Sequence, residues 1–94
     1  MKIVINTIHG GFSLSPKAIS ELGKRGVSVD SWGRDIARDD KDLVEVVEKL
    51  GTRADGAFAR LEVIEIPDGV LWQIEEYDGW EWVAEQHRVW RHDE

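Results

Sequence analysis

The chain has no cysteine, only two prolines and no long run of apolar residues. Without cysteine it forms neither disulfide bonds nor thiolate metal sites, a composition that suits a reducing compartment. Its N-terminal apolar run is only Ile3-Val4-Ile5, whereas a signal-peptide core needs ~7–15 residues. No run approaches the ~20 apolar residues that span a bilayer. We therefore expect a soluble, cytoplasmic protein with no membrane partner.

Basic residues are scarce in one part of the chain. The net charge is −7, and residues 60–85 carry all of it, because Arg60 is their only base. The acidic residues of this region are Glu62, Glu65, Asp68, Glu75, Glu76, Asp78, Glu81 and Glu85. Such a field repels phosphates and attracts basic partners, so direct nucleic-acid binding is disfavoured. The alternative is that the acids only keep a sheet soluble.

The length of 94 residues predicts a single domain, 1–94. Five tryptophans and many aliphatic residues supply a core that disordered chains lack. The β-branched run at 2–6 predicts a first strand.

Two helices are predicted in the first half of the chain. Ser15 is the expected N-cap of the first, with Pro16 at its first position and Gly26 beyond its end. Asp39 or Asp40 is expected to cap the second. Its apolar residues recur at helical spacing, and Gly51 follows them; they are Leu43, Val46, Val47 and Leu50. Between the helices, residues 27–30 suit a brief strand, and Glu45 and Lys49 are spaced as an ion pair within the second helix.

The second half of the chain predicts strands. Residues 59–66 form the first, with either a bulge or burial on both faces, because Ile64 and Ile66 break the alternation. Asp78-Gly79 predicts a two-residue hairpin turn between two further strands. The expected fold is α+β: a small two-layer sandwich with an antiparallel sheet of about four strands and two helices on one face.

The aromatic residues of the hairpin allow two interpretations. Trp80 and Trp82 share a face, and the core interpretation places Trp72 and Trp82 inside. The interface interpretation makes an acidic, aromatic surface the candidate partner-binding site. Its residues are Glu75, Glu76, Tyr77, Asp78, Glu81, Glu85 and Trp90.

A glycine-rich loop after the first strand is the alternative site. It lies where α/β proteins place phosphates, although its glycines lack the spacing of a dinucleotide or P-loop motif. A small ligand or nucleotide would contact Asn6, His9, Gly10, Gly11 and Ser13.

No catalytic pattern is present in the sequence. The three histidines, His9, His87 and His92, lack metal-site spacing, and the serines lack a nucleophile elbow. We expect no enzyme, no cofactor and no metal site.

Several blocks of the sequence resemble a family of small phage and prophage proteins. They are MKIVIN, GGFSLS, RDDKDLVEVVEKLG and IPDGVLWQIEEYDGWEWVAEQHRVW, in this order along nearly the whole chain. The resemblance implies a phage-encoded protein that binds a host protein stoichiometrically, such as a defence nuclease or CRISPR effector with a basic groove. It implies no catalytic residue. A homo-oligomeric phage component is a further alternative.

Overall fold

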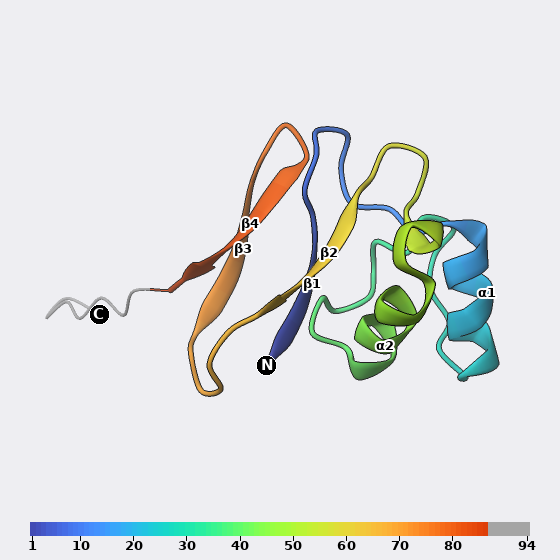
Figure 1. Ribbon diagram of the computed structural model, residues 1–94, viewed down its shortest axis with the longest axis horizontal. Helices are drawn as coiled ribbons and strands as arrows, with labels where there is room; N and C mark the ends of the chain where they lie inside the picture. Colours follow the sequence, from blue (N-terminus) through green and yellow to red (C-terminus); the bar gives the residue numbers. More distant parts are fainter. Residues whose placement is uncertain (87–94) are drawn as a thin grey trace, which may run out of the picture.

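The structure is a computed structural model that describes residues 1–86, and it places two helices on one side of the strands (Figure 1). A short 3-10 turn, Gly51–Ala54, follows the second helix. In chain order the other elements are β1 (Lys2–Asn6), α1 (Pro16–Lys24), α2 (Lys41–Leu50), β2 (Leu61–Glu65), β3 (Trp72–Tyr77) and β4 (Trp80–Glu85). The α+β class is confirmed. In the described part of the chain, no helix is long and apolar enough to cross a membrane.

Both helices begin and end at the predicted signals. The Ser15 hydroxyl accepts from the Ala18 N–H at 3.1 Å, and the Asp40 carboxylate accepts from the Leu43 N–H at 3.0 Å. These bonds satisfy donors that a helix start leaves without partners. Gly51 ends α2 with a φ of 58°.

Ion pairs connect the two helices. The predicted Glu45–Lys49 pair is wrong, because each of these residues pairs with a different residue. Glu45 binds Arg25, and Lys49 binds Glu21 at 3.2 Å. The hydrogen bond from Lys49 holds the pKa of the Glu21 carboxyl below its ordinary value. Cross-helix partners are available because α1 and α2 pack against each other.

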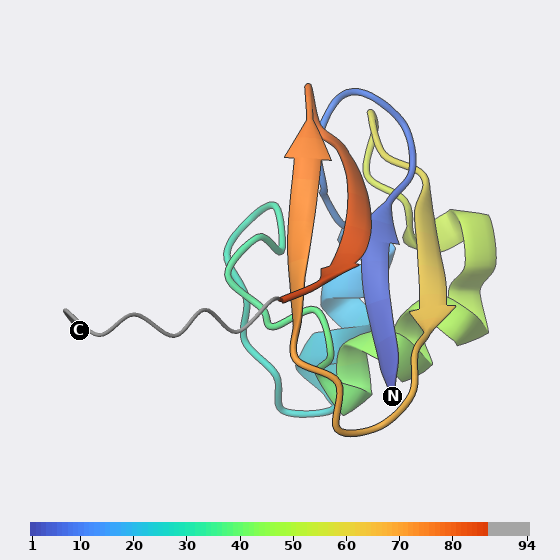
Figure 2. The ribbon, with the colours of Figure 1, turned by 90° about the vertical axis from the view of Figure 1, so that its left-hand side faces the viewer.

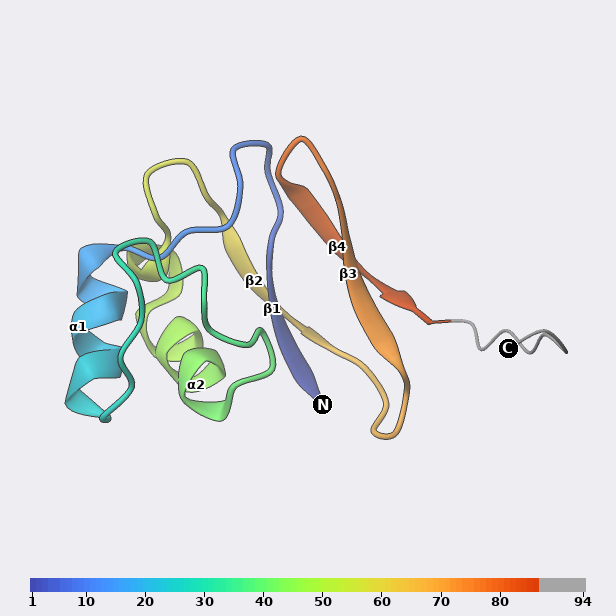
Figure 3. The same cartoon turned by 180° about the vertical axis from the view of Figure 1, so that it is seen from behind.

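The strands form two antiparallel sheets of two strands each, β1–β2 and β3–β4, instead of the single sheet that the sequence suggested. The register of β1 with β2 runs without a bulge from Lys2–Glu65 to Asn6–Leu61. The hairpin β3–β4 lies across the β1–β2 sheet from the helices (Figures 1 and 3) and beside β1 (Figure 2). The molecule therefore has helices, a central strand pair and an outer hairpin.

The edge of β1 that does not pair with β2 already has hydrogen-bond partners, which explains why β4 does not extend the first sheet. The Val4 N–H donates to the Arg38 carbonyl at 2.9 Å, and the Asn6 N–H donates to the Glu81 carboxylate at 2.8 Å. A loop and a side chain thus take the donors that the backbone of β4 would otherwise bind.

The core lies between the helices and one face of β1–β2. Val4 joins the buried residues of both helices there, including Leu22 and Leu43. Ile3 and Ile5 are also buried but point to the other face of β1, the side on which the hairpin lies (Figure 1). Burial on both faces explains why the β-branched residues Ile3, Val4 and Ile5 follow one another without a polar residue between them.

The brief strand predicted at 27–30 is absent, because other bonds hold this segment. The Val27 N–H donates to the Leu22 carbonyl at 2.9 Å. The Asp30 carboxylate accepts from the backbone N–H groups of Trp32 and Arg34 at 3.0 and 2.9 Å. Asp30 therefore organises a loop in place of a strand.

Candidate binding surface on the C-terminal hairpin

The β3–β4 hairpin turns at Asp78-Gly79, as its sequence predicts. Both residues have positive φ angles, 50° and 85°, the requirement of a type I′ turn. The resulting register opposes Tyr77 to Trp80 and Glu75 to Trp82. Directly opposed residues point to the same side of a sheet, so these four side chains share one face, which we call the outer face.

The tryptophans of β4 point outward, so the core interpretation, which placed Trp72 and Trp82 inside, is wrong for Trp82. The exposed fractions of Trp80 and Trp82 are 49% and 43%, and that of Tyr77 is 72%. Trp72 lies on the opposite, inner face and is half-buried. Alternation along β4 correctly groups Trp80 with Trp82, but it does not determine which group is buried.

Glu81 is the buried member of the hairpin, so its placement on an exposed acidic face is also wrong. Only 7% of it is exposed. Its two carboxylate oxygens bind the two terminal nitrogens of Arg38 at 2.6 and 2.8 Å, and one also accepts the Asn6 N–H. The Arg38 guanidinium lies 3.6 Å from the centroid of the Phe12 ring. This network offsets the cost of burying a carboxylate.

A pocket of about 430 Å³ opens on the outer face, lined by His9, Tyr77, Trp80 and Trp82. The His9 ring makes edge-on contacts with Tyr77 and Trp80, with centroid distances of 6.2 and 5.4 Å. The Glu75 carboxylate accepts the Trp82 indole N–H at 3.0 Å. The pocket is therefore aromatic and has a carboxylate attached to one of its walls.

Exposed carboxylates lie on the hairpin that carries this pocket, with Glu75 on its outer face, Asp78 at its turn, and Glu76 and Glu85 on its inner face. Glu75, Glu76, Asp78 and Glu85 are exposed, and residues 61–86 contain no lysine or arginine. The Glu76 carboxylate accepts the Gly79 N–H at 2.9 Å, and an Asp78 carboxylate oxygen lies 3.8 Å from His9 Nδ1. With Glu81 paired to Arg38, these are the hairpin residues that keep the predicted acidic surface. Trp90, also predicted there, lies outside the described residues.

The glycine-rich loop holds the hairpin in place. The Asn6 side-chain amide donates to the Ile8 and Gly79 carbonyls at 2.6 and 2.7 Å and accepts the Arg60 N–H at 2.8 Å. The Gly10 N–H donates to the Asp78 carbonyl at 3.3 Å. These contacts leave the Asn6 side chain no free donor for a ligand.

The other residues of the predicted ligand loop separate into different environments. Ser13 is buried, and its side chain packs so closely on Gly56 that a Cβ there would lie 1.9 Å from the Ser13 hydroxyl. Gly11 also packs closely on Gly79, because a Cβ at Gly79 would lie 2.3 Å from the Gly11 nitrogen. His9 is exposed and faces the aromatic pocket. The loop and the hairpin, predicted as alternative sites, therefore share His9.

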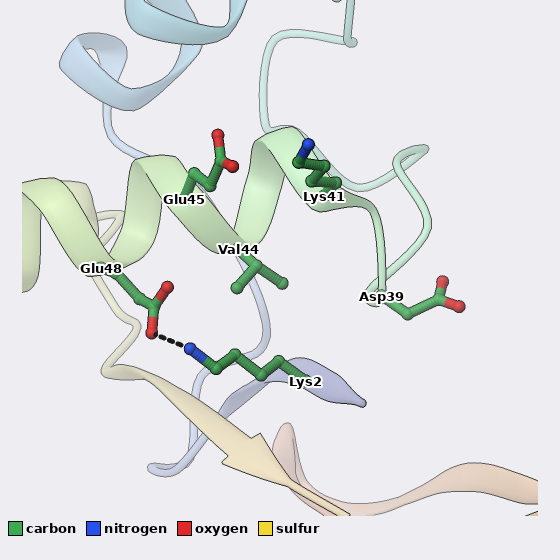
Figure 4. Close-up of a pocket in the computed structure, with 6 residues that line it drawn as sticks. All are labelled: Lys2, Asp39, Lys41, Val44, Glu45 and Glu48. Atoms are coloured by element: carbon green, nitrogen blue, oxygen red, sulfur yellow. Dashed lines mark hydrogen bonds and ion pairs between the residues drawn. The ribbon is translucent and has the colours of Figure 1, made fainter. Parts of the chain in front are cut away.

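A second pocket, of about 320 Å³, lies beside α2 (Figure 4). The Lys2 ammonium binds the Glu48 carboxylate at 2.9 Å in this pocket, and this hydrogen bond raises the pKa of Lys2. Asp39 and Lys41 line the same pocket. Its charges are of both signs, so they largely offset one another, and it has no aromatic wall.

Within residues 1–86 no group of three metal-ligating side chains is present. His87 and His92 lie outside this range. Comparisons with protein-family models, with curated proteins and with solved structures give no match.

No sequence signal identified Arg38, the partner of the buried carboxylate, or Phe12, whose ring contacts the Arg38 guanidinium. Arg38 follows residues 27–37, which have no regular periodicity, so no pattern indicated that its side chain points inward. A signal did exist at Glu81, since it is the only acidic residue between two tryptophans in β4. Once the tryptophans face outward, Glu81 must face inward and needs a cationic partner.

Proposed function

We propose that this chain is a non-enzymatic binding protein that docks the outer face of its hairpin on a basic site of a partner protein. The observation that carries the proposal is the exposure of Tyr77, Trp80 and Trp82 in a stretch without lysine or arginine, 61–86. Exposed aromatic residues supply most of the binding energy at protein interfaces. Surrounding carboxylates increase the rate of encounter with a basic partner and select against an acidic one.

The partner class follows from the charge and from the resemblance to phage proteins. A groove that binds nucleic acid is lined by lysine and arginine, so an acidic sheet can occupy it in place of phosphates. We propose a host protein of this kind, for example a defence nuclease, in the host cytoplasm. The same carboxylates disfavour direct contact with nucleic acid or an anionic membrane.

Self-association through this face is disfavoured for the same reason. Two copies of the outer face would bring Glu75 and Asp78 of each chain toward like charges. A symmetric dimer through the hairpin should therefore form only at high salt, where these charges are screened. Light scattering at low salt is expected to give a monomer.

The test uses a synthetic basic peptide, nona-lysine, and the full chain. Binding measured by calorimetry should weaken steeply between about 50 and 500 mM salt, because exposed charges are screened. Glu75→Gln combined with Asp78→Asn, at two exposed carboxylates beside the aromatic pocket, should weaken it further. The matched control, Asp39→Asn with Glu48→Gln, removes the same charge near α2 (Figure 4) and should have a smaller effect. Affinity that does not change with salt would contradict the proposal.

A further inference from the structure

We infer that the pocket of His9, Tyr77, Trp80 and Trp82 receives the guanidinium group of an arginine side chain of the partner. This inference rests on the proposed docking function and names the chemical group that the outer face recognises. The pocket volume of about 430 Å³ is within the ~300–1,000 Å³ typical of sites for small ligands. It is thus large enough for one long side chain.

The walls of the pocket favour a cation. Tryptophan and tyrosine attract cations through the negative faces of their rings, and tryptophan does so most strongly. The pocket contains two tryptophans and one tyrosine, all partly exposed to solvent. A neutral apolar ligand would gain from the same rings but not from the carboxylates around them.

Glu75 provides the negative charge that complements a guanidinium. Its two carboxylate oxygens accept from the Trp82 indole and from the Gln73 side-chain amide at 3.0 and 3.1 Å. Each oxygen of a carboxylate has two acceptor positions, so both can still accept from a ligand. These bonds also hold the carboxylate and the Trp82 ring in fixed relative positions before a partner arrives, which lowers the entropy cost of binding.

Arginine fits this arrangement better than lysine. A guanidinium is planar, stacks on aromatic rings and presents paired donors to a carboxylate, whereas an ammonium is compact and more strongly hydrated. The protein already uses this contact internally. The Arg38 guanidinium lies 3.6 Å from the Phe12 centroid while it binds Glu81, and that of Arg34 lies 5.8 Å from the Trp32 centroid. The outer pocket has the same two groups, an aromatic ring and a carboxylate, and residues 61–86 contain no arginine that could bind them.

The hairpin that carries the pocket is anchored at its turn. Asn6 binds the Gly79 carbonyl, and Gly10 binds the Asp78 carbonyl. His9, between these two anchors, contacts both Tyr77 and Trp80. The turn end of the pocket is therefore fixed by β1 and its loop, so the rings are positioned before binding.

The experiment titrates the full chain with four capped tripeptides, Gly-X-Gly, in which X is arginine, lysine, citrulline or norleucine. Citrulline is the uncharged isostere of arginine, and norleucine is apolar. Binding is followed by NMR of the indole N–H groups. Arginine should shift the Trp80 and Trp82 signals and bind about fivefold more tightly than lysine. Citrulline and norleucine should bind much more weakly than either.

Variants locate the site. Trp80→Ala and Glu75→Gln should each reduce arginine affinity about fivefold, and Tyr77→Ala, at a highly exposed position, gives a second pocket variant that should fold normally. Trp32→Ala, at an exposed tryptophan in another loop, and Glu48→Gln, in the pocket beside α2, are the controls and should leave the affinity unchanged. Folding of each variant is checked from its amide spectrum.

Two results would overturn the inference: equal binding of arginine and citrulline, or shifts that centre on Trp32. If this happens while nona-lysine still binds with steep salt dependence, acidic docking stands and only the arginine pocket is wrong. If nona-lysine also fails to bind, the proposed function is wrong as well.

Discussion

Arg38 and Glu81 form a two-pronged ion pair that joins a loop to the hairpin, with N–O distances of 2.6 and 2.8 Å. The pair lies at the edge of β1, where Glu81 also binds the Asn6 N–H and Arg38 the Val4 carbonyl, at 2.8 and 3.4 Å. Side chains thereby connect β4 to β1 where a backbone ladder is missing. The position of the outer face depends on this connection.

Removing one member of the pair should destabilise the protein strongly. Arg38→Met leaves a buried carboxylate without its cation, and Glu81→Leu leaves a guanidinium without its anion. We expect each change to lower the free energy of unfolding by about 2–4 kcal/mol. This is somewhat less than the loss from breaking a fully buried pair, because the Arg38 side chain is 19% exposed. Urea unfolding measures the loss.

The double variant completes this test. Arg38→Met with Glu81→Leu should cost less than the sum of the two single changes, because neither charge is then left unpaired. Simple additivity would show that the two side chains do not depend on each other.

Gly79 should tolerate substitution less well than Gly69. Both have positive φ, 85° and 82°, so alanine costs about 1 kcal/mol of backbone strain at either position. At Gly79 its Cβ would also lie 2.3 Å from the Gly11 nitrogen, whereas nothing lies within 4 Å at Gly69. The expected difference between the two alanine variants is about 2 kcal/mol or more in unfolding free energy. Similar values would mean that the contact between turn and loop contributes little.

The loop at Asp30 should lose stability in acid. Backbone N–H groups, first that of Arg34 and then that of Trp32, hold the pKa of the Asp30 carboxyl below its ordinary value near 3.8. A lowered pKa stabilises the folded state above pH 3.8, and this contribution is lost as the pH falls through the lower, folded-state pKa. The stability difference between the wild type and Asp30→Ala should therefore be constant above about pH 5 and shrink in acid. If the stability difference between the wild type and Asp30→Ala instead grew as the pH falls, the prediction would be contradicted.

Charged quenchers should distinguish the environments of the tryptophans. In a variant whose Trp32, Trp72 and Trp90 are phenylalanine, fluorescence reports only Trp80 and Trp82. Caesium should quench this signal more efficiently than iodide, because nearby carboxylates attract cations. Glu75→Gln should reduce the caesium preference, and Asp39→Asn should not. Weak quenching by neutral acrylamide would place the two rings inside the protein.

The local structure could be predicted from the sequence because short-range signals determine it. Caps at Ser15 and Asp40 fixed where the helices begin, and Asp78-Gly79 fixed the hairpin register. Each signal acts over a few residues through backbone geometry.

Long-range structure could not be predicted in the same way. Alternation in β4 separates Trp80 and Trp82 from Glu81, but burial of either set satisfies the pattern. Burial of Glu81 depends on Arg38, a residue 43 positions earlier. Likewise, β2 pairs with β1 and not with β3. Strand propensity does not determine which strands pair with each other. The aromatic pocket follows from these choices. From the sequence, His9 and Tyr77 were therefore assigned to two separate candidate sites, and Trp80 and Trp82 to neither.

The bond from the Asn6 backbone to Glu81 spans 75 positions along the chain. A ribosome releases β1 before β4. Until β4 has been made, the edge of β1 that does not pair with β2 has no Glu81 carboxylate to bind. Contacts so distant in sequence slow folding, because a long loop must close before they form. Among the described residues, the outer face should therefore be the last part to acquire its final shape during synthesis.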